Sequence, residues 1–136
     1  MGPDVIRTAP ECWLTPRSLV DSPELGPGLD PVALEAGVKR LAARADVQAL
    51  VVFGSRASGR ARPNSDLDLL VIGREPSIPP ERQLLLWQEL RSALGDVGVP
   101  VDLLVYGHSE ATKLSGSRWH VLGHAARSGR VLYVAE

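Results

Sequence analysis

The chain has 136 residues, which fits one domain built around a single core. Hydrophobic residues make up 44% and charged residues 23% of it, which is typical of a globular protein and excludes a largely disordered or membrane-embedded chain. The formal net charge is -1, from 15 basic and 16 acidic residues, and this balance argues against a general nucleic-acid or anionic-membrane binder.

The first part of the chain, residues 1–29, carries five prolines and two late glycines. Such a composition predicts an extended or poorly ordered arm, which Trp13 and Leu14 could hold against a folded domain. We expect that domain to span residues 30–136. Its first helix should begin at Asp30-Pro31, because Asp is a good N-cap and Pro fits the first helical position.

Short apolar runs and helical periodicity predict the elements that follow. Residues 49–53 form an apolar run that indicates a buried strand, and residues 56–64 are polar and small, which is typical of a loop with one helical turn at most. The remaining predicted elements are a strand at 66–72, a helix at 80–94, a strand at 99–106, a helix within 117–127 and a strand at 131–134. Alternating strands and helices favour an α/β or α+β layered domain.

Asp66 and Asp68 lie two residues apart on the second predicted strand. Side chains at this spacing point to the same face, with roughly 6 to 7 Å between their Cα atoms. Two carboxylates held side by side repel each other unless a cation lies between them, and a hard cation such as Mg²⁺ prefers oxygen ligands. The alternative is a solvated strand start after a polar loop.

Asp102 interrupts the third predicted strand, which is otherwise apolar. An unpaired buried carboxylate is costly, so such a residue usually has a partner or a metal. If this strand lies beside the second one, three carboxylates converge and can hold two metal ions about 4 Å apart, as in-line phosphoryl displacement requires. Pairing of Asp102 with one of the many arginines is the alternative.

Gly54-Ser55 follows the first buried strand. Glycine there lets backbone N–H groups approach a phosphate, and the Ser55 hydroxyl adds a donor. Arg56, Arg60 and Arg62 follow and could neutralise a triphosphate, although a plain turn and a solvated loop are the simpler interpretations. Residues 54–59 nearly match a Walker A loop, but Arg60-Ala61 replace the required Lys and Ser/Thr, so we reject a P-loop NTPase.

The run from Phe53 to Val71 resembles the signature of the minimal nucleotidyltransferases of the DNA polymerase β-like superfamily. Their pattern is Gly-Ser, about ten residues, Asp-x-Asp on a strand and a third acid on a later strand, here Asp102. The resemblance covers roughly residues 30–134 and implies an α+β nucleotidyltransferase fold, a mixed β-sheet flanked by helices.

The resemblance also implies the roles of the site residues. Asp66 and Asp68 would ligate two Mg²⁺ ions and the NTP phosphates, and Asp102 would ligate the catalytic metal and help to deprotonate an acceptor hydroxyl. The nucleotide-binding residues would be Gly54, Ser55, Arg56 and Ser65. The implied reaction moves an NMP, AMP from ATP in the first instance, to the acceptor and releases pyrophosphate.

Many minimal nucleotidyltransferases resemble antitoxins that bind a HEPN-type partner protein and in some cases modify it with AMP, so the resemblance implies such a partner here. Two other functions stay open: a non-catalytic antitoxin that acts by binding alone, and an aminoglycoside-type enzyme with a small-molecule acceptor. The sequence does not settle whether the chain forms a homo-oligomer.

The remaining sequence features carry less chemistry. The one cysteine, Cys12, permits no internal disulfide, and no apolar run approaches the ~20 residues of a membrane span, so we expect a cytosolic protein without membrane contact. His120 and His124 lie one helical turn apart, but without the HExxH pattern we assign them structural or surface roles. Trp87 and Trp119 are expected in the core or at an interface.

Overall fold

The computed structural model describes residues 11–20 and 23–136. Its helices are α1 (Glu11–Leu14), α2 (Pro31–Ala42), α3 (Ser55–Ser58), α4 (Pro80–Leu94), α5 (His108–Ser115) and α6 (Val121–Ser128). Its strands are β1 (Val47–Phe53), β2 (Leu67–Gly73), β3 (Val101–Gly107) and β4 (Arg130–Val134).

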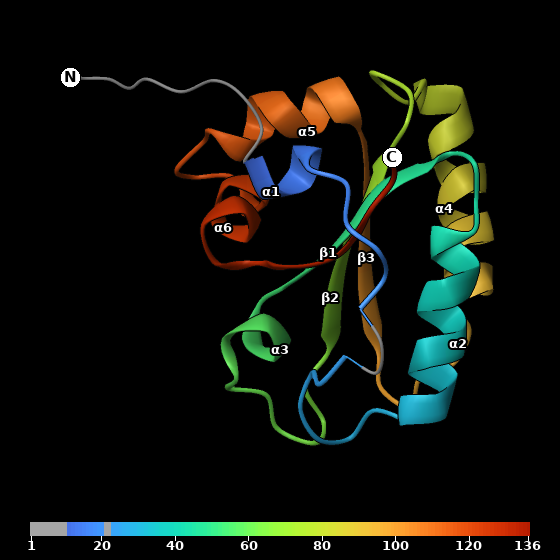
Figure 1. Ribbon diagram of the computed structural model, residues 1–136, viewed down its shortest axis with the longest axis vertical. Helices are drawn as coiled ribbons and strands as arrows, with labels where there is room; N and C mark the ends of the chain where they lie inside the picture. The colour runs from blue at the N-terminus through green and yellow to red at the C-terminus, as the bar shows by residue number, and fades with distance from the viewer. Residues whose placement is uncertain (1–10, 21–22) are drawn as a thin grey trace.

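The four strands form one mixed sheet in the order β3-β2-β1-β4. β1 pairs antiparallel with β2 and β4, whereas β2 and β3 are parallel. Figure 1 shows α2 and α4 on one face of the sheet and α1, α5 and α6 on the other. The predicted α+β fold, a mixed β-sheet flanked by helices, is confirmed.

The α2 helix begins where the sequence predicts. The side chain of Asp30 accepts hydrogen bonds from the backbone N–H groups of Val32 and Ala33 at 3.1 and 3.2 Å, and Pro31 follows at the first helical position. These bonds satisfy two of the N–H groups that a helix start leaves without intrahelical partners. The cap therefore fixes where the chain turns from the N-terminal segment into the domain.

The side chains of β2 alternate between the two faces of the sheet, and the apolar ones enter two separate cores, one on each face. Leu67 and Leu69 point into the core between the sheet and α2 and α4. Leu70 and Ile72 point into the core on the other face, which α1, α5 and α6 complete. Asp68 alternates with Leu67 and Leu69, so it lies on the face of α1, α5 and α6.

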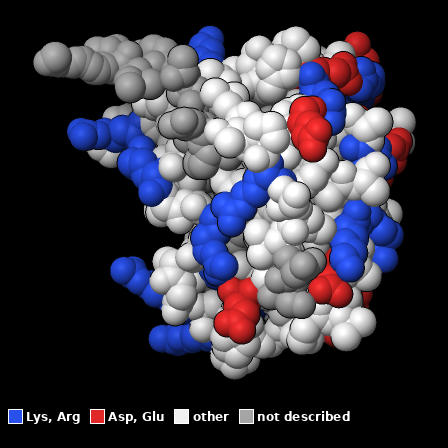
Figure 2. Space-filling model, viewed as in Figure 1, with Lys and Arg blue, Asp and Glu red and all other residues white. Residues whose placement is uncertain are grey.

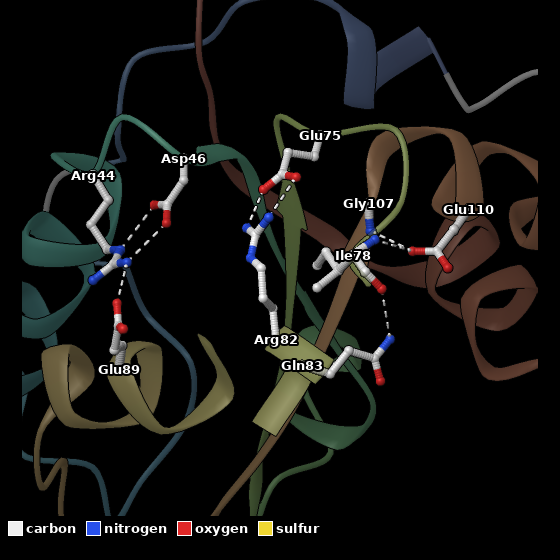
Figure 3. Close-up of polar contacts among 9 residues, drawn as sticks. All are labelled: Arg44, Asp46, Glu75, Ile78, Arg82, Gln83, Glu89, Gly107 and Glu110. Atoms are coloured by element: carbon white, nitrogen blue, oxygen red, sulfur yellow. Dashed lines mark hydrogen bonds and ion pairs between the residues drawn. The ribbon is translucent and has the colours of Figure 1, made fainter. Parts of the chain in front are cut away.

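The α4 helix makes the crossover that parallel β2 and β3 require. Its bounds match the predicted helix, and its own residues Leu90 and Leu94 are buried against the sheet. Ion pairs tie its exposed side to the rest of the domain: Arg44 bridges Asp46 and Glu89, and Arg82 pairs with Glu75 (Figure 3).

The α5 helix was not predicted. Its eight residues are mostly polar and carry little apolar periodicity. A carboxylate oxygen of Glu110 caps it by accepting from the backbone N–H groups of Gly107 at 3.0 Å and Ile78 at 3.3 Å (Figure 3). The long-range contact to Ile78 is invisible in the sequence, and this is why the helix was missed.

Part of the predicted N-terminal arm lies outside the described residues, namely 1–10 and 21–22. The described part contacts the domain: Trp13 is 3% exposed in a core, and Arg17 exchanges two backbone hydrogen bonds with Val134 at the sheet edge. Leu14, in contrast, is exposed. The division at residue 30 stays a prediction, but residues 13–20 and 23–29 pack on the fold.

Within the described chain, no helix combines the length and apolar character that crossing a membrane requires.

Candidate functional site

Two of the three predicted acids are neighbours across the sheet. In the parallel register of β2 and β3, Asp68 is the partner of Asp102. Residues in register on adjacent strands lie about 4.7–4.9 Å apart and project to the same face. Asp66 stands one residue before β2, is exposed and is therefore positioned by a loop rather than by the strand.

Gly54 brings the end of β1 against the Asp68 carboxylate. It adopts φ 73° and ψ -155°, a backbone conformation that is accessible essentially only to glycine. A Cβ atom at this position would lie 2.2 Å from Oδ2 of Asp68. The glycine turn and the acid predicted from separate sequence features are therefore in direct contact.

The electrostatics of Asp68 reflect its neighbours. Burial, followed by the negative charges of Asp102 and Asp66, raises the pKa of Asp68 above that of a free aspartate. Among the described residues, none of the three acids takes part in an ion pair with Lys, Arg or His. Asp68 and Asp102, neighbouring carboxylates with no ion-pair partner among the described residues, make a donor set that suits a divalent cation.

A cation fits the Asp68–Asp102 pair by this donor chemistry. Across residues 11–20 and 23–136, however, no three His, Cys, Asp or Glu side chains are arranged to hold a metal ion together. The structure places Asp68 next to Asp102 on one side and Gly54 on the other. Asp66 as a third ligand stays a prediction, supported by its electrostatic contribution to Asp68.

Ser55 opens the short helix α3 directly after Gly54. The carbonyl of Gly54 accepts from the N–H groups of Ala57 and Ser58 at 3.1 and 3.2 Å, so the chain reverses tightly at this point. Ser55 is half-buried, and its hydroxyl makes no hydrogen bond to the described protein. The hydroxyl is thus free to donate to a ligand beside Gly54.

Arg56 behaves differently from the prediction. Its side chain is 1% exposed, and its guanidinium donates to the backbone carbonyls of Leu25 (2.8 Å), Pro27 (2.9 Å), Arg62 (3.3 Å) and Ser65 (3.1 and 2.8 Å). A guanidinium has five N–H groups, and five bonds use all of them. We therefore correct the expectation that this guanidinium contacts the triphosphate: its donors are committed to the loop.

Ser65 also has a structural bond, since its hydroxyl accepts from the backbone N–H of Arg62 at 2.8 Å. Its assignment to the nucleotide stays a prediction. Arg60 and Arg62 are exposed in the loop after α3, and Figure 2 shows basic side chains projecting from this part of the molecule. Their expected contact with a triphosphate stays a prediction.

The histidines and tryptophans are placed as follows. Nδ1 of His120 accepts from the backbone N–H of Leu122 at the start of α6, and the His120 ring packs edge-on against Tyr106, 6.0 Å between centroids. His124 contacts Ser128. Trp87 donates to the carbonyl of Leu103 at 2.9 Å and is 38% exposed. Trp119 is 89% exposed, so it does not lie in the core, and the expected interface position stays a prediction.

The sequence also missed a neighbour of the site. Residues 25–28, assigned to the arm, contact the loop between α3 and Asp66 through the Arg56 bonds. Gly26 and Gly28 were the available signal, since both adopt positive φ. The composition predicts an extended or poorly ordered arm, whereas in the structure these glycines permit close backbone approach.

A comparison with known families identifies the family of the chain. Residues 34–121 match the model of the nucleotidyltransferase domain, a span that includes Gly54, Ser55 and the three acids. The chain belongs to this family and is a nucleotidyltransferase. The resemblance carried by residues 53–71 is thereby confirmed.

Two solved structures are similar to the chain. A toxin-antitoxin structure with AMP-PNP is 24% identical, with coverage of 73% of this chain and 71% of that one and a TM-score of 0.47. The toxin-antitoxin MntA-HpeT mutant is 21% identical, with coverage of 73% and 70% and a TM-score of 0.45. No curated protein matches the chain.

Proposed function

We propose that the protein transfers AMP from ATP to a hydroxyl group of a partner protein, with Mg²⁺ held by Asp66, Asp68 and Asp102. The observation that carries the proposal is the contact of the Gly54 turn with Asp68, which is itself in register with Asp102. A phosphate-binding turn beside two carboxylates is the arrangement that metal-assisted phosphoryl transfer needs.

Each residue has a role in this proposal. The N–H groups at Gly54 and Ser55 and the Ser55 hydroxyl would donate to the β- and γ-phosphate oxygens. Bound Mg²⁺ would supply charge neutralisation of the phosphates and of the transition state. Asp102 would accept the proton of the acceptor hydroxyl as its oxygen bonds to the α-phosphorus. The bond between the α-phosphorus and the bridging oxygen then breaks, and pyrophosphate leaves with that electron pair.

A protein acceptor is supported by an apolar surface on α4, which we call the α4 patch: Leu84, Leu85 and Trp87. Their side chains are 67%, 59% and 38% exposed. Leu84 and Trp87 also line a groove of about 450 Å³ between α4 and the edge strand β3. Contiguous apolar surface of this kind marks protein–protein contacts.

Two acidic side chains near the α4 patch, Glu75 and Glu89, are paired within the chain. Arg82 pairs with Glu75, and Arg44 holds Glu89 at 3.0 Å (Figure 3). An apolar surface of a HEPN-type protein would bury the exposed leucines. We further propose a cytosolic location, for which the single cysteine is the support.

Label transfer tests the proposal. The protein is incubated with Mg²⁺ and ATP labelled at the α-phosphate, with and without the purified product of the neighbouring gene. We expect label on the partner, loss of transfer in the Asp66→Ala/Asp68→Ala variant, and no loss in Asp96→Ala, a substitution of an exposed acid outside the site.

The outcome also separates the alternatives. If the double variant neutralises the partner as well as the wild-type protein does, binding alone suffices and the non-catalytic antitoxin is correct. If label appears on an aminoglycoside and not on the protein, the acceptor is a small molecule. Absence of Mg²⁺-dependent ATP binding in the wild-type protein would refute the proposal.

A further inference from the structure

The segment before α2 is locked against the loop that leads to Asp66. A Cβ atom on Gly28 would lie 1.9 Å from the carbonyl oxygen of Pro63, and one on Gly26 would lie 2.9 Å from Cβ of Ala61. Both glycines adopt positive φ, 95° and 91°. Figure 1 shows the two segments side by side at the lower end of the sheet. Only glycine allows this separation of the two backbones.

Arg56 lies between the two segments and bonds to both. It donates to the carbonyls of Leu25 and Pro27 on one side and to those of Arg62 and Ser65 on the other, at 2.8–3.3 Å. Buried polar groups of this kind are costly to leave without partners, so the four carbonyls and the guanidinium hold one another in place.

The bonds to Ser65 bear on the site because Asp66 is the next residue. Ser65 accepts twice from Arg56, at 3.1 and 2.8 Å, and Leu67 on the other side of Asp66 donates to the carbonyl of Pro100 at 2.9 Å. Asp66 is thereby held between two anchored neighbours although it belongs to no strand. Its distance from Asp68 and Asp102 depends on both anchors.

We propose that the segment Leu25–Gly28 and Arg56 are positioning elements of the nucleotide site, which set the placement of Asp66 without contacting substrate. The segment precedes the span 34–121 that matches the family model, so this chain supplies the support from outside that span. The proposal rests on the proposed function of Asp66 and adds the part of the chain that holds this residue.

The test compares Gly28→Ala with Gly95→Ala. Gly95 also adopts positive φ, 77°, but a Cβ there meets only the end of the Arg40 side chain at 3.1 Å. Both variants carry the strain of alanine at positive φ, and only Gly28→Ala pushes on the loop. Arg56→Lys is the second variant, because one ammonium with three donors cannot bond to four carbonyls.

Two measurements are made on the full chain at a temperature where each variant is folded. The first is the Mg²⁺ concentration for half-maximal binding of a fluorescent ATP analogue, and the second is amide hydrogen exchange of residues 62–67 without nucleotide. For Gly28→Ala and Arg56→Lys we expect at least about a tenfold rise in the Mg²⁺ midpoint and faster exchange in this loop. For Gly95→Ala we expect a lower Tm with both readouts unchanged.

The result that overturns the inference is a Mg²⁺ midpoint within twofold of wild type in both Gly28→Ala and Arg56→Lys, with stability alone reduced. If Gly28→Ala does not fold, Arg56→Lys decides the question. Failure of the proposed function is seen separately, because the wild-type protein would then show no Mg²⁺-dependent binding while the exchange difference in residues 62–67 is still measurable.

Discussion

Replacing Gly54 with alanine should damage the site more than the fold. At φ 73° and ψ -155° an alanine costs about 1–3 kcal/mol of stability. In addition, its Cβ would lie 2.2 Å from Oδ2 of Asp68, whereas Cβ atoms essentially never approach other atoms closer than 3.0 Å. The carboxylate and the turn must therefore separate by at least 0.8 Å, the difference between these two distances.

A displacement near 1 Å at a reacting site costs about 100-fold in rate, or roughly 2.7 kcal/mol of transition-state stabilisation. We expect kcat/KM for AMP transfer to fall by about that factor in Gly54→Ala. The assay is steady-state pyrophosphate release, corrected for the folded fraction measured by circular dichroism.

Gly95→Ala is the matched control, since Gly95 has almost the same backbone conformation, φ 77° and ψ -170°, at the end of α4. It should lose similar stability and keep its kcat/KM. If Gly54→Ala keeps more than a third of the wild-type kcat/KM, or if Gly95→Ala loses as much, the contact between Gly54 and Asp68 does not serve the reaction.

Three further predictions follow from side-chain environments. Burial and like charges raise the pKa of Asp68, so its ionised form costs stability at neutral pH. That stability is recovered as pH falls through the raised pKa and is fully regained below 3.8. Asp68→Asn should therefore raise the metal-free unfolding free energy at pH 7 by about 0.5–2 kcal/mol and abolish stabilisation by Mg²⁺, as urea titrations would show. Arg44, chiefly by hydrogen bonding, lowers the pKa of Asp46, so this pair adds stability above pH 3.8 that is lost as pH falls through the lowered value. Arg44→Gln should cost at most about 1 kcal/mol at pH 7, and in thermal melts its Tm should fall less steeply with decreasing pH. Leu84→Ser should weaken partner binding about tenfold, as measured by calorimetry, because it removes roughly 1.4 kcal/mol of apolar contact, and ATP affinity should stay constant. An unchanged partner affinity would exclude the α4 patch as the interface.

Local signals explain which elements could be predicted. The Asp30 cap, the apolar run before Gly54 and the leucine periodicity of α4 depend on residues close in sequence, and the structure has them where expected. α5 could not be predicted, because its stabilising contact from Glu110 reaches residue 78, 32 positions away.

The site was predictable in its parts and not in its assembly. Asp68 and Asp102 each looked anomalous in an apolar strand, but no local pattern states that β2 and β3 are neighbours and parallel. That step came from the resemblance to a known family. Arg56 shows the opposite limit: a loop arginine looks solvated in sequence, and only the packing of residues 25–28 reveals that it is buried.

Because Asp68 and buried core leucines share the β2 strand, its length is constrained residue by residue. Asp68 faces one side and Leu67 and Leu69 the other, so deleting a single position would exchange the two sets. The carboxylate would then be driven into hydrocarbon between the sheet and α4, and leucines would replace it beside Gly54. In the connection between α3 and Asp66, an added residue would meet least resistance at Gly59, where nothing lies within 4 Å of an added Cβ.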